Sequence, residues 1–441
     1  MKKSRKIIAV IFSLFLVANL SSCGNALENA LSNATLLSAP AAISAVGYEE
    51  RSTDGYKELL RGADDFSAAF SEAAFSAYEK PENFAVSPVS VFMALSLAAE
   101  CSASETQRQI LSALNVGYPS LSENFAAFFS ALCFEQKDGE KLVAKAMPTN
   151  SIWVNEGFDA KKTTLDSLSE KYYCYSYAAD FKNKTKQAND AIRKFVKDNT
   201  NGLIDKNFNL SKYTIFTLIN TFYLKDAWDI STDLFFTDKK YEFKEENAVK
   251  NVNLLQGHYF SGRKYEGENF TSFYTATSHG YKLKFILPND GYTVSDVFTA
   301  ENLKEINSVK DYNAIDDENM IKYTTRCLFP EFKASYDESI KDILSGGMGI
   351  TDFFNEYACD LSGITNQEAY CEKAVHAVEL KVDKTGLEGA AVTVFGMKAT
   401  SEGPWEEYTV VRENFILDRP FGFIITSPEG VPLFSGVIRT I

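Results

Sequence analysis

The chain has 441 residues, of which 45% are hydrophobic, which is enough for a large core and excludes disorder over most of its length. Its 45 lysines and arginines face 59 aspartates and glutamates, and the resulting charge of -14 opposes binding to a phosphate backbone, so a nucleic-acid partner is excluded. The three histidines (His258, His279 and His376) are isolated in sequence, so we expect neither a metal site nor a cofactor.

The first 23 residues have the order of an export signal. Four basic residues within positions 1–6 precede an apolar run from Ile7 to Leu20. The tetrapeptide that ends at Cys23 resembles the lipobox of bacterial lipoproteins, which implies that a lipidated Cys23 is the first mature residue. Cleavage by an ordinary signal peptidase, with Cys23 lost or left free, is the alternative. In both cases we expect an exported protein, and the lipobox places it on the cell surface or the outer face of a bacterial membrane.

Residues 24–62 are rich in Ala, Ser, Asn and Leu without a sustained period, which favours a flexible tether. The remaining residues, 63–441, contain no linker-like segment, so we expect one large domain.

Helices are predicted in the first part of this domain. Apolar residues recur at helical spacing from Asp65 to Ala77, and a short strand at 83–86 follows. Ser87 and Pro88 then form a helix start, with a hydroxyl able to cap, before a helix to Ala99 that is apolar on all sides. The pair Ser104 and Gln107 predicts a capping box for a helix that ends near Leu114.

Strands are predicted mainly in the second part. The run 214–224 is almost continuously apolar or β-branched, which is typical of a strand covered on both faces. Segments 282–287 and 324–329 each stop at a proline, and 421–426 and 431–438 are predicted to form a hairpin. Helices concentrated early and strands concentrated late predict an α+β fold.

Apart from Cys23, six cysteines are spread along the chain without the paired spacing of a zinc site: Cys101, Cys133, Cys174, Cys327, Cys359 and Cys371. In an oxidising compartment Cys359 and Cys371 could form a disulfide. Buried free thiols are the favoured interpretation, because a large core does not need disulfides. Since the phosphate-binding and hydrolase motifs are also absent, the sequence does not predict an enzyme.

Several segments are similar to those of the serpin family, in the family's order and near its spacing. The first are 83–90 (NFAVSPVS) and 220–228 (NTFYLKDAW), followed by 361–364, 373–376, 386–393 and 415–421. The resemblance covers residues 64–439 and is weakest between 115 and 212. It implies a serpin fold, with helices packed on a large central β-sheet that accepts a reactive loop, plus smaller sheets.

The resemblance also implies roles for polar residues that would singly be satisfied core residues. Ser87, Ser90, Asn220 and His376 would meet in one hydrogen-bonded cluster under the sheet, the shutter. A buried cluster of this kind is costly unless every member is paired, which suits a latch on a sheet that must open. Trp228 would lie at the top of the sheet, the breach, where loop insertion begins.

The reactive loop would span about 384–412, and its hinge would comprise Gly386, Leu387, Glu388, Gly389, Ala390, Ala391, Val392 and Thr393. In an extended hinge the odd-numbered residues from 387 to 393 point to one face and can be buried beneath the sheet. Lys384 stands where the family usually has an acid, and Leu387 where it usually has a threonine.

Counting along the loop as the family does places the reactive bond between Thr400 and Ser401, which would suit an elastase-like protease. The run from this bond to Pro420 is about nine residues longer than is common in the family, which leaves Met397 and Lys398 as alternatives. The implied function is covalent, suicide-substrate inhibition of an extracellular serine protease by a monomer. A non-inhibitory serpin-fold binding protein on the cell surface is the alternative.

Overall fold

The computed structural model describes residues 31, 33–229, 231–309, 315–316, 318–388 and 408–441. Most of the helices lie early in the chain, as expected. The described helices are α2 (Tyr48–Ser52), α3 (Asp54–Ser76), α4 (Pro88–Cys101), α5 (Ser104–Leu114), α6 (Tyr118–Ala131), α7 (Lys162–Lys171), α8 (Thr185–Asn199), α9 (Val294–Val297), α10 (Ala300–Ser308), η1 (Ile343–Gly347) and η2 (Asp352–Phe354).

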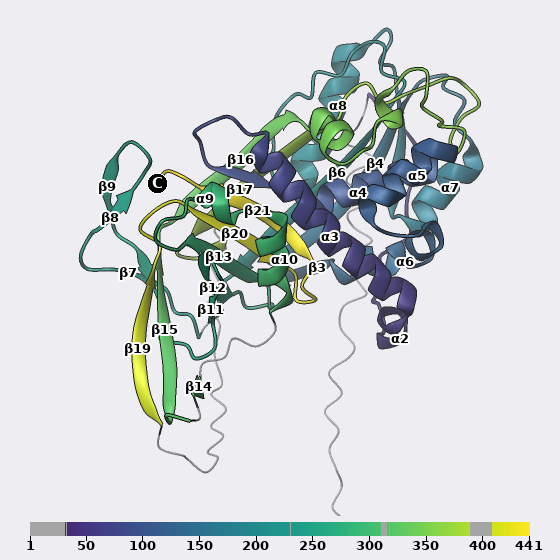
Figure 1. Cartoon of the computed structure of the whole chain (residues 1–441). Coiled ribbons are helices and arrows are strands. Elements are labelled where there is room, and N and C mark those ends of the chain that lie inside the picture. The colour runs from purple at the N-terminus through teal and green to yellow at the C-terminus, as the bar shows by residue number, and fades with distance from the viewer. Residues whose placement is uncertain (1–30, 32, 230, 310–314, 317, 389–407) are drawn as a thin grey trace, which may run out of the picture.

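A large curled sheet of fourteen described strands runs through the molecule (Figure 1). Its strands, in spatial order, are β1 (Thr35–Ser38), β5 (Cys174–Ala179), β4 (Lys141–Asn155), β6 (Phe216–Ala227), β18 (Gly386–Leu387), β17 (Val375–Asp383), β16 (Phe332–Ser339), β2 (Phe84–Val86), β21 (Pro432–Ile438), β20 (Phe421–Thr426), β13 (Lys282–Pro288), β12 (Phe270–Ala276) and β11 (Lys264–Glu266), with β3 (Phe134–Asp138) paired to β4.

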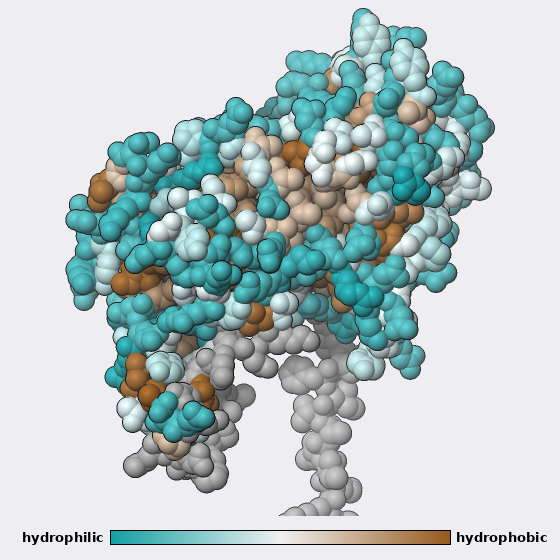
Figure 2. Space-filling model, in the orientation of Figure 1, coloured by the Kyte–Doolittle hydropathy of each residue, from teal (hydrophilic) through white to brown (hydrophobic). Residues whose placement is uncertain are grey.

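Two smaller sheets complete the described part of the chain. The first contains β14 (Ile315–Asp316), β15 (Ile321–Phe329), β10 (Leu255–Gln256), β7 (Phe235–Phe236) and β19 (Thr409–Ile416), and the second pairs β8 (Tyr241–Lys244) with β9 (Val249–Val252). The parallel strands β15 and β19 form a long ribbon that extends from the body (Figure 1). Hydrophilic side chains cover most of the face seen in Figure 2.

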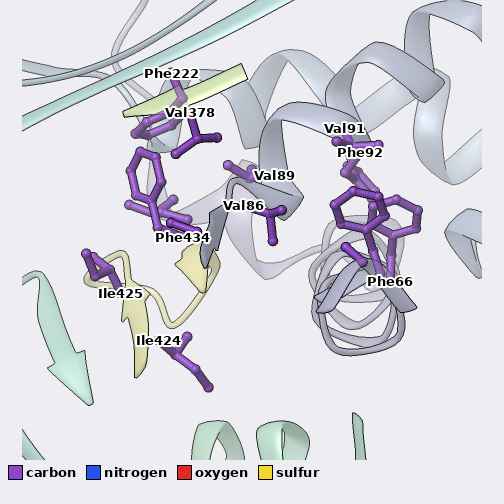
Figure 3. Close-up of a cluster of buried hydrophobic side chains, with 14 of the residues drawn as sticks. Phe66, Val86, Val89, Val91, Phe92, Phe222, Val378, Ile424, Ile425 and Phe434 are labelled. Carbon is purple, nitrogen blue, oxygen red and sulfur yellow. The ribbon is translucent and has the colours of Figure 1, made fainter. Parts of the chain in front are cut away.

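Helix α4 lies at the centre of the core, which explains why its sequence is apolar on all sides. All its residues except Ala94 and Glu100 are buried. Phe92 meets Phe66 of α3 with ring centroids 5.8 Å apart, while Val89 lies on the side of the sheet (Figure 3). Helix α4 therefore packs between helix α3 and the large sheet.

The two serine hydroxyl groups expected to cap helices α4 and α5 make no capping hydrogen bond. Pro88 occupies the first turn of α4 as predicted, but the Ser87 side chain makes no capping hydrogen bond. The prediction of a capping box from Ser104 and Gln107 is wrong. Gln107 Nε2 donates to the carbonyl oxygens of Ala99 and Ser102, at 2.9 and 3.2 Å, because the end of α4 lies within its reach.

The first long helix begins at Asp54 and not at Asp65. Thr53 caps it, since its side-chain oxygen accepts from the Tyr56 N–H at 3.1 Å. Further upstream, β1 pairs with β5 at the edge of the sheet. Part of the segment 24–62, expected to be a tether, therefore contributes regular structure.

The predicted strands are confirmed with small shifts of their ends, as β6, β13, β15 and the antiparallel pair β20 and β21. The prediction that 214–224 is covered on both faces holds for one half of β6 only. Residues 216–220 are half-buried, whereas 221–224 are buried. Among the described residues, no helix is long and apolar enough to span a bilayer.

We expect Leu31→Ala to lower the free energy of unfolding by about 2 kcal/mol, because this side chain is 4% exposed in a cluster with Trp153, Tyr177 and Phe195. Leu37→Ala is the matched control, since Leu37 is 45% exposed and should cost less than about 0.5 kcal/mol. Urea titration measures both values. Equal, small effects would show that this segment does not belong to the folded body.

Candidate functional site

The strands β6 and β17 are held together only at one end. There the short strand β18 lies between them, with Leu387 opposite Val382 of β17 and Asp226 of β6. Beyond β18, no ladder joins β6 to β17 within the described residues. This missing partner explains why residues 216–220 of β6 are only half-buried.

A cavity of about 130 Å³ fills the position that a longer β18 would occupy. The cavity is lined by α4 and by those parts of β6 and β17 that have no described strand on the side facing the cavity. Phe222 of β6, Val378 of β17 and Phe434 of β21 come together there, and the Phe222 and Phe434 rings are 5.9 Å apart (Figure 3). Neighbouring strands in a sheet lie about 4.8 Å apart, and no ladder joins β6 to β17 beside this cavity within the described residues.

The first two hinge residues are already part of the sheet. Leu387 is fully buried and Gly386 pairs with Ala227 and Asp383. Gly386 has a φ of +153°, and a Cβ there would lie 2.1 Å from the carbonyl oxygen of Asp226, so only glycine fits. A bulky Leu387 at the expected threonine position is thus accommodated in the core.

At Glu388 the extended conformation ends. This residue has a φ of +67°, and its N–H donates to the Lys381 carbonyl oxygen at 2.7 Å. Its carboxylate accepts from the Tyr223 hydroxyl at 2.8 Å and lies 3.4 Å from Lys225 Nζ. Burial and this carboxylate raise the pKa of Tyr223. Glu388 therefore stops β18 and attaches the chain to the face of β6.

The next hinge residues and the reactive bond lie outside the described residues. They are Gly389, Ala390, Ala391, Val392, Thr393, Met397, Lys398, Thr400 and Ser401. The chain is described again from 408, and β19 follows.

Three of the four predicted shutter residues form one hydrogen-bonded group. The Ser87 N–H donates to His376 Nε2 at 3.0 Å, and the Ser87 hydroxyl donates to the Leu433 carbonyl oxygen at 2.8 Å. The Ser90 hydroxyl lies 3.0 Å from that of Ser87. This group links the start of α4 to β17 and β21.

Asn220 is not bonded to this group in the described residues, contrary to the expectation of one cluster of four. Its Nδ2 donates to Asn150 Oδ1 at 2.7 Å, because Asn150 lies directly opposite it on β4. All four predicted residues nevertheless line the same cavity. Asn150 was missed because the pairing of β4 with β6 cannot be read from local sequence.

His376 is held neutral by its surroundings. It is 6% exposed and its ring lies beside those of Phe70 and Tyr336. Burial, with a smaller contribution from Lys206, lowers its pKa to about 3. Its Nε2 can therefore accept the hydrogen bond from Ser87 at neutral pH.

Trp228 stabilises the other end of the unfilled position between β6 and β17, which we call the gap. Its Nε1 donates to the Asp383 carbonyl oxygen at 2.8 Å, and its backbone N–H donates to the Thr385 carbonyl oxygen at 3.3 Å. Asp226, also missed by the sequence analysis, is buried beside it and lies 2.8 Å from His279 Nδ1. These contacts fix the end of β6 against the turn that leads into β18.

A family model described as Serpin (serine protease inhibitor) matches residues 62–440. The chain belongs to the serpin family. Serpin-Z10 of Arabidopsis thaliana is 26% identical over 382 residues, which cover 81% of this chain and 91% of that protein. The predicted family membership is confirmed, and the family's description is that of inhibitors and not of catalysts.

Solved structures support the same fold. The native state of the thermophilic serpin tengpin matches with a TM-score of 0.71 and 21% identity, over 93% of this chain and all of that one. Thyroxine-binding globulin in complex with thyroxine matches with a TM-score of 0.66 and 21% identity, over 85% and 98%. The predicted serpin fold is thus confirmed. Among the described residues of this serpin, no group of three or more metal-ligating side chains is placed to hold an ion.

His376 should make this serpin sensitive to mild acid. Its pKa is about 3 in the native state and 6.5 when unperturbed, so between these values the unfolded chain binds a proton that the native chain does not. The free energy of unfolding should therefore fall as pH drops below about 6.5, by up to roughly 1.4 kcal/mol per pH unit from this group.

Denaturant titration of wild type and His376→Asn between pH 6.5 and 5 tests this expectation. The variant should lose much of the pH dependence, while His258→Asn, a change at an exposed histidine, should keep it. An unchanged slope in His376→Asn would assign the acid sensitivity to other groups.

Proposed function

We propose that this serpin inhibits serine proteases as a suicide substrate, by inserting its cleaved loop as a strand between β6 and β17. The observation that carries the proposal is β18. Its two residues pair with both neighbouring strands, and the cavity continues in line with them. Insertion would extend a strand that has already begun.

In the proposed reaction, the protease serine attacks the Thr400 carbonyl carbon. An ester forms, the bond between Thr400 and Ser401 breaks, and the Ser401 nitrogen leaves as an amine after taking a proton. The loop then inserts before water hydrolyses the ester. Roughly ten new backbone hydrogen bonds at about 1 kcal/mol each would release on the order of 10 kcal/mol, enough to distort a docked active site.

The target is proposed from the residue before the cut. Thr400 would suit a protease with a small apolar pocket, such as an elastase-like enzyme. Sequencing of the released C-terminal peptide identifies the bond. A peptide that begins at Ser401 supports this assignment, whereas one that begins at Ala399 indicates cleavage after Lys398 and a trypsin-like target.

Thr393→Arg should convert the inhibitor into a substrate. The alternation of an extended hinge sends residue 393 beneath the sheet on insertion, where an unpaired guanidinium costs several kcal/mol. Insertion should stall, and the ester should have time to hydrolyse. We expect loss of the complex that survives denaturing gel electrophoresis, faster cleavage, and loss of the rise in thermal stability after cleavage.

Val392→Arg is the matched control, because residue 392 points to the opposite face of the inserted strand. It should still form the stable complex. If Thr393→Arg traps the protease as efficiently as wild type, inhibition by loop insertion is refuted. If wild type forms no stable complex with any of a panel of serine proteases, the alternative of a non-inhibitory binding protein is favoured.

We also propose that a lipid on Cys23 anchors the protein to the outer face of a bacterial membrane. The supporting observation is the order of basic start, apolar run and lipobox-like tetrapeptide. Cys23→Ala should abolish lipid modification and release the protein from the detergent phase, while Ser22→Ala, which keeps the cysteine, should not. Unchanged partition of Cys23→Ala into detergent would exclude this anchor.

A further inference from the structure

Two of the six described free thiols lie on neighbouring segments, near the Val375 end of β17. Cys359 is in the turn after η2, where its N–H donates to the Asn355 carbonyl oxygen at 3.0 Å. Cys371 precedes β17, and its N–H donates to the carbonyl oxygen of Phe353, the central residue of η2, at 2.9 Å. Both are partly buried and pack against the same core.

The two cysteines are also near each other. The backbone N–H of Cys371 approaches the Cys359 sulfur, and the Cys371 thiol, which lies 3.5 Å from the Lys373 carbonyl oxygen, is close enough to feel the charge of a Cys359 thiolate. Neither thiol is engaged in an ion pair or a metal site among the described residues.

Through Cys371, the pair lies beside the cavity between β6 and β17. Cys371 lines the cavity together with Phe353, Phe354 and Lys373, and it lies four residues before the start of β17. A covalent bond at this point would tie η2 to the Val375 end of β17, one of the two strands that flank the cavity.

We propose that Cys359 and Cys371 form a disulfide in the exported protein, and that this bond slows loop insertion by restraining the Val375 end of β17. The second half rests on the proposed function, and the first does not. The six cysteines that the structure describes are free thiols, so the proposal concerns a second, oxidised form.

The oxidant is a disulfide-carrying thiol oxidase outside the cytoplasm. The Cys359 thiolate attacks a sulfur of the oxidase disulfide and forms a mixed disulfide, releasing one oxidase thiolate. The Cys371 thiolate then attacks the Cys359 sulfur and displaces the second oxidase thiolate. The two cysteines thereby lose two protons and two electrons, and the oxidase becomes a dithiol. Burial raises the pKa of Cys359 to about 11 and that of Cys371 to about 12, so formation should be slow near neutral pH without this catalyst.

Peptide mapping tests the bond. The full chain, exported by its own signal, is alkylated in denaturant without reductant, digested and analysed by mass spectrometry. We expect a cross-linked peptide that joins Cys359 to Cys371, and two more alkylated cysteines after reduction. Complete alkylation without reduction, even after incubation with oxidised glutathione, or a cross-link between the buried neighbours Cys101 and Cys174 in its place, would overturn the proposal.

A second measurement tests the effect on insertion without requiring a target. The loop is cut by a protease that is not inhibited, and insertion is followed as the increase in the midpoint of thermal unfolding. We expect insertion at least threefold faster after reduction of wild type, no effect of reductant on Cys359→Ser, and a wild-type response in Cys133→Ser. Equal rates for oxidised and reduced wild type would refute the restraint. If cleaved wild type shows no increase in midpoint in either state, loop insertion itself fails, while the mapping result stands independently.

Discussion

No strand of the described chain occupies most of the position between β6 and β17, and the described elements are arranged around this position. Backbone groups at a strand edge need partners, and edges are normally covered or paired. Here the described chain leaves residues 216–220 half-buried and closes the space with side chains of α4, β17 and β21. In the proposed mechanism the inserted loop would supply backbone hydrogen bonds at this position, and local contacts would oppose its entry.

Those local contacts lie at the two ends of the gap and share one property. At one end a backbone N–H of Ser87 bonds to the His376 ring, and at the other the Trp228 ring bonds to the Asp383 backbone. Each joins a side chain to a backbone group of another element. Neither bond belongs to a strand ladder, so the insertion that we propose would break both while β4 remains paired with β6 and β16 with β17.

The features that could be predicted from sequence are those with a local cause. The all-round apolar character of α4 and the hairpin of β20 and β21 follow from neighbouring residues. The failures come from contacts between distant segments. Gln107 bonds to the end of α4, and Asn220 bonds to its opposite residue on β4. The start of α3 at Asp54 was missed although Tyr56, Leu59 and Ala63 continue the helical apolar spacing upstream of Asp65, and the Thr53 cap was a further usable signal.

In the proposed mechanism, the left-handed backbone of Glu388 would influence the rate of loop insertion separately from protease recognition. A positive φ costs a non-glycine residue about 1–3 kcal/mol, and this strain disappears if the residue becomes extended. The contacts with Tyr223 and Lys225 act in the opposite direction, because they stabilise the conformation in which β18 stops. Glu388, at the end of β18, is thus subject to two opposing contributions to its free energy. In the proposed mechanism, changes at Glu388 would alter the rate of loop insertion without altering the sequence that a protease reads.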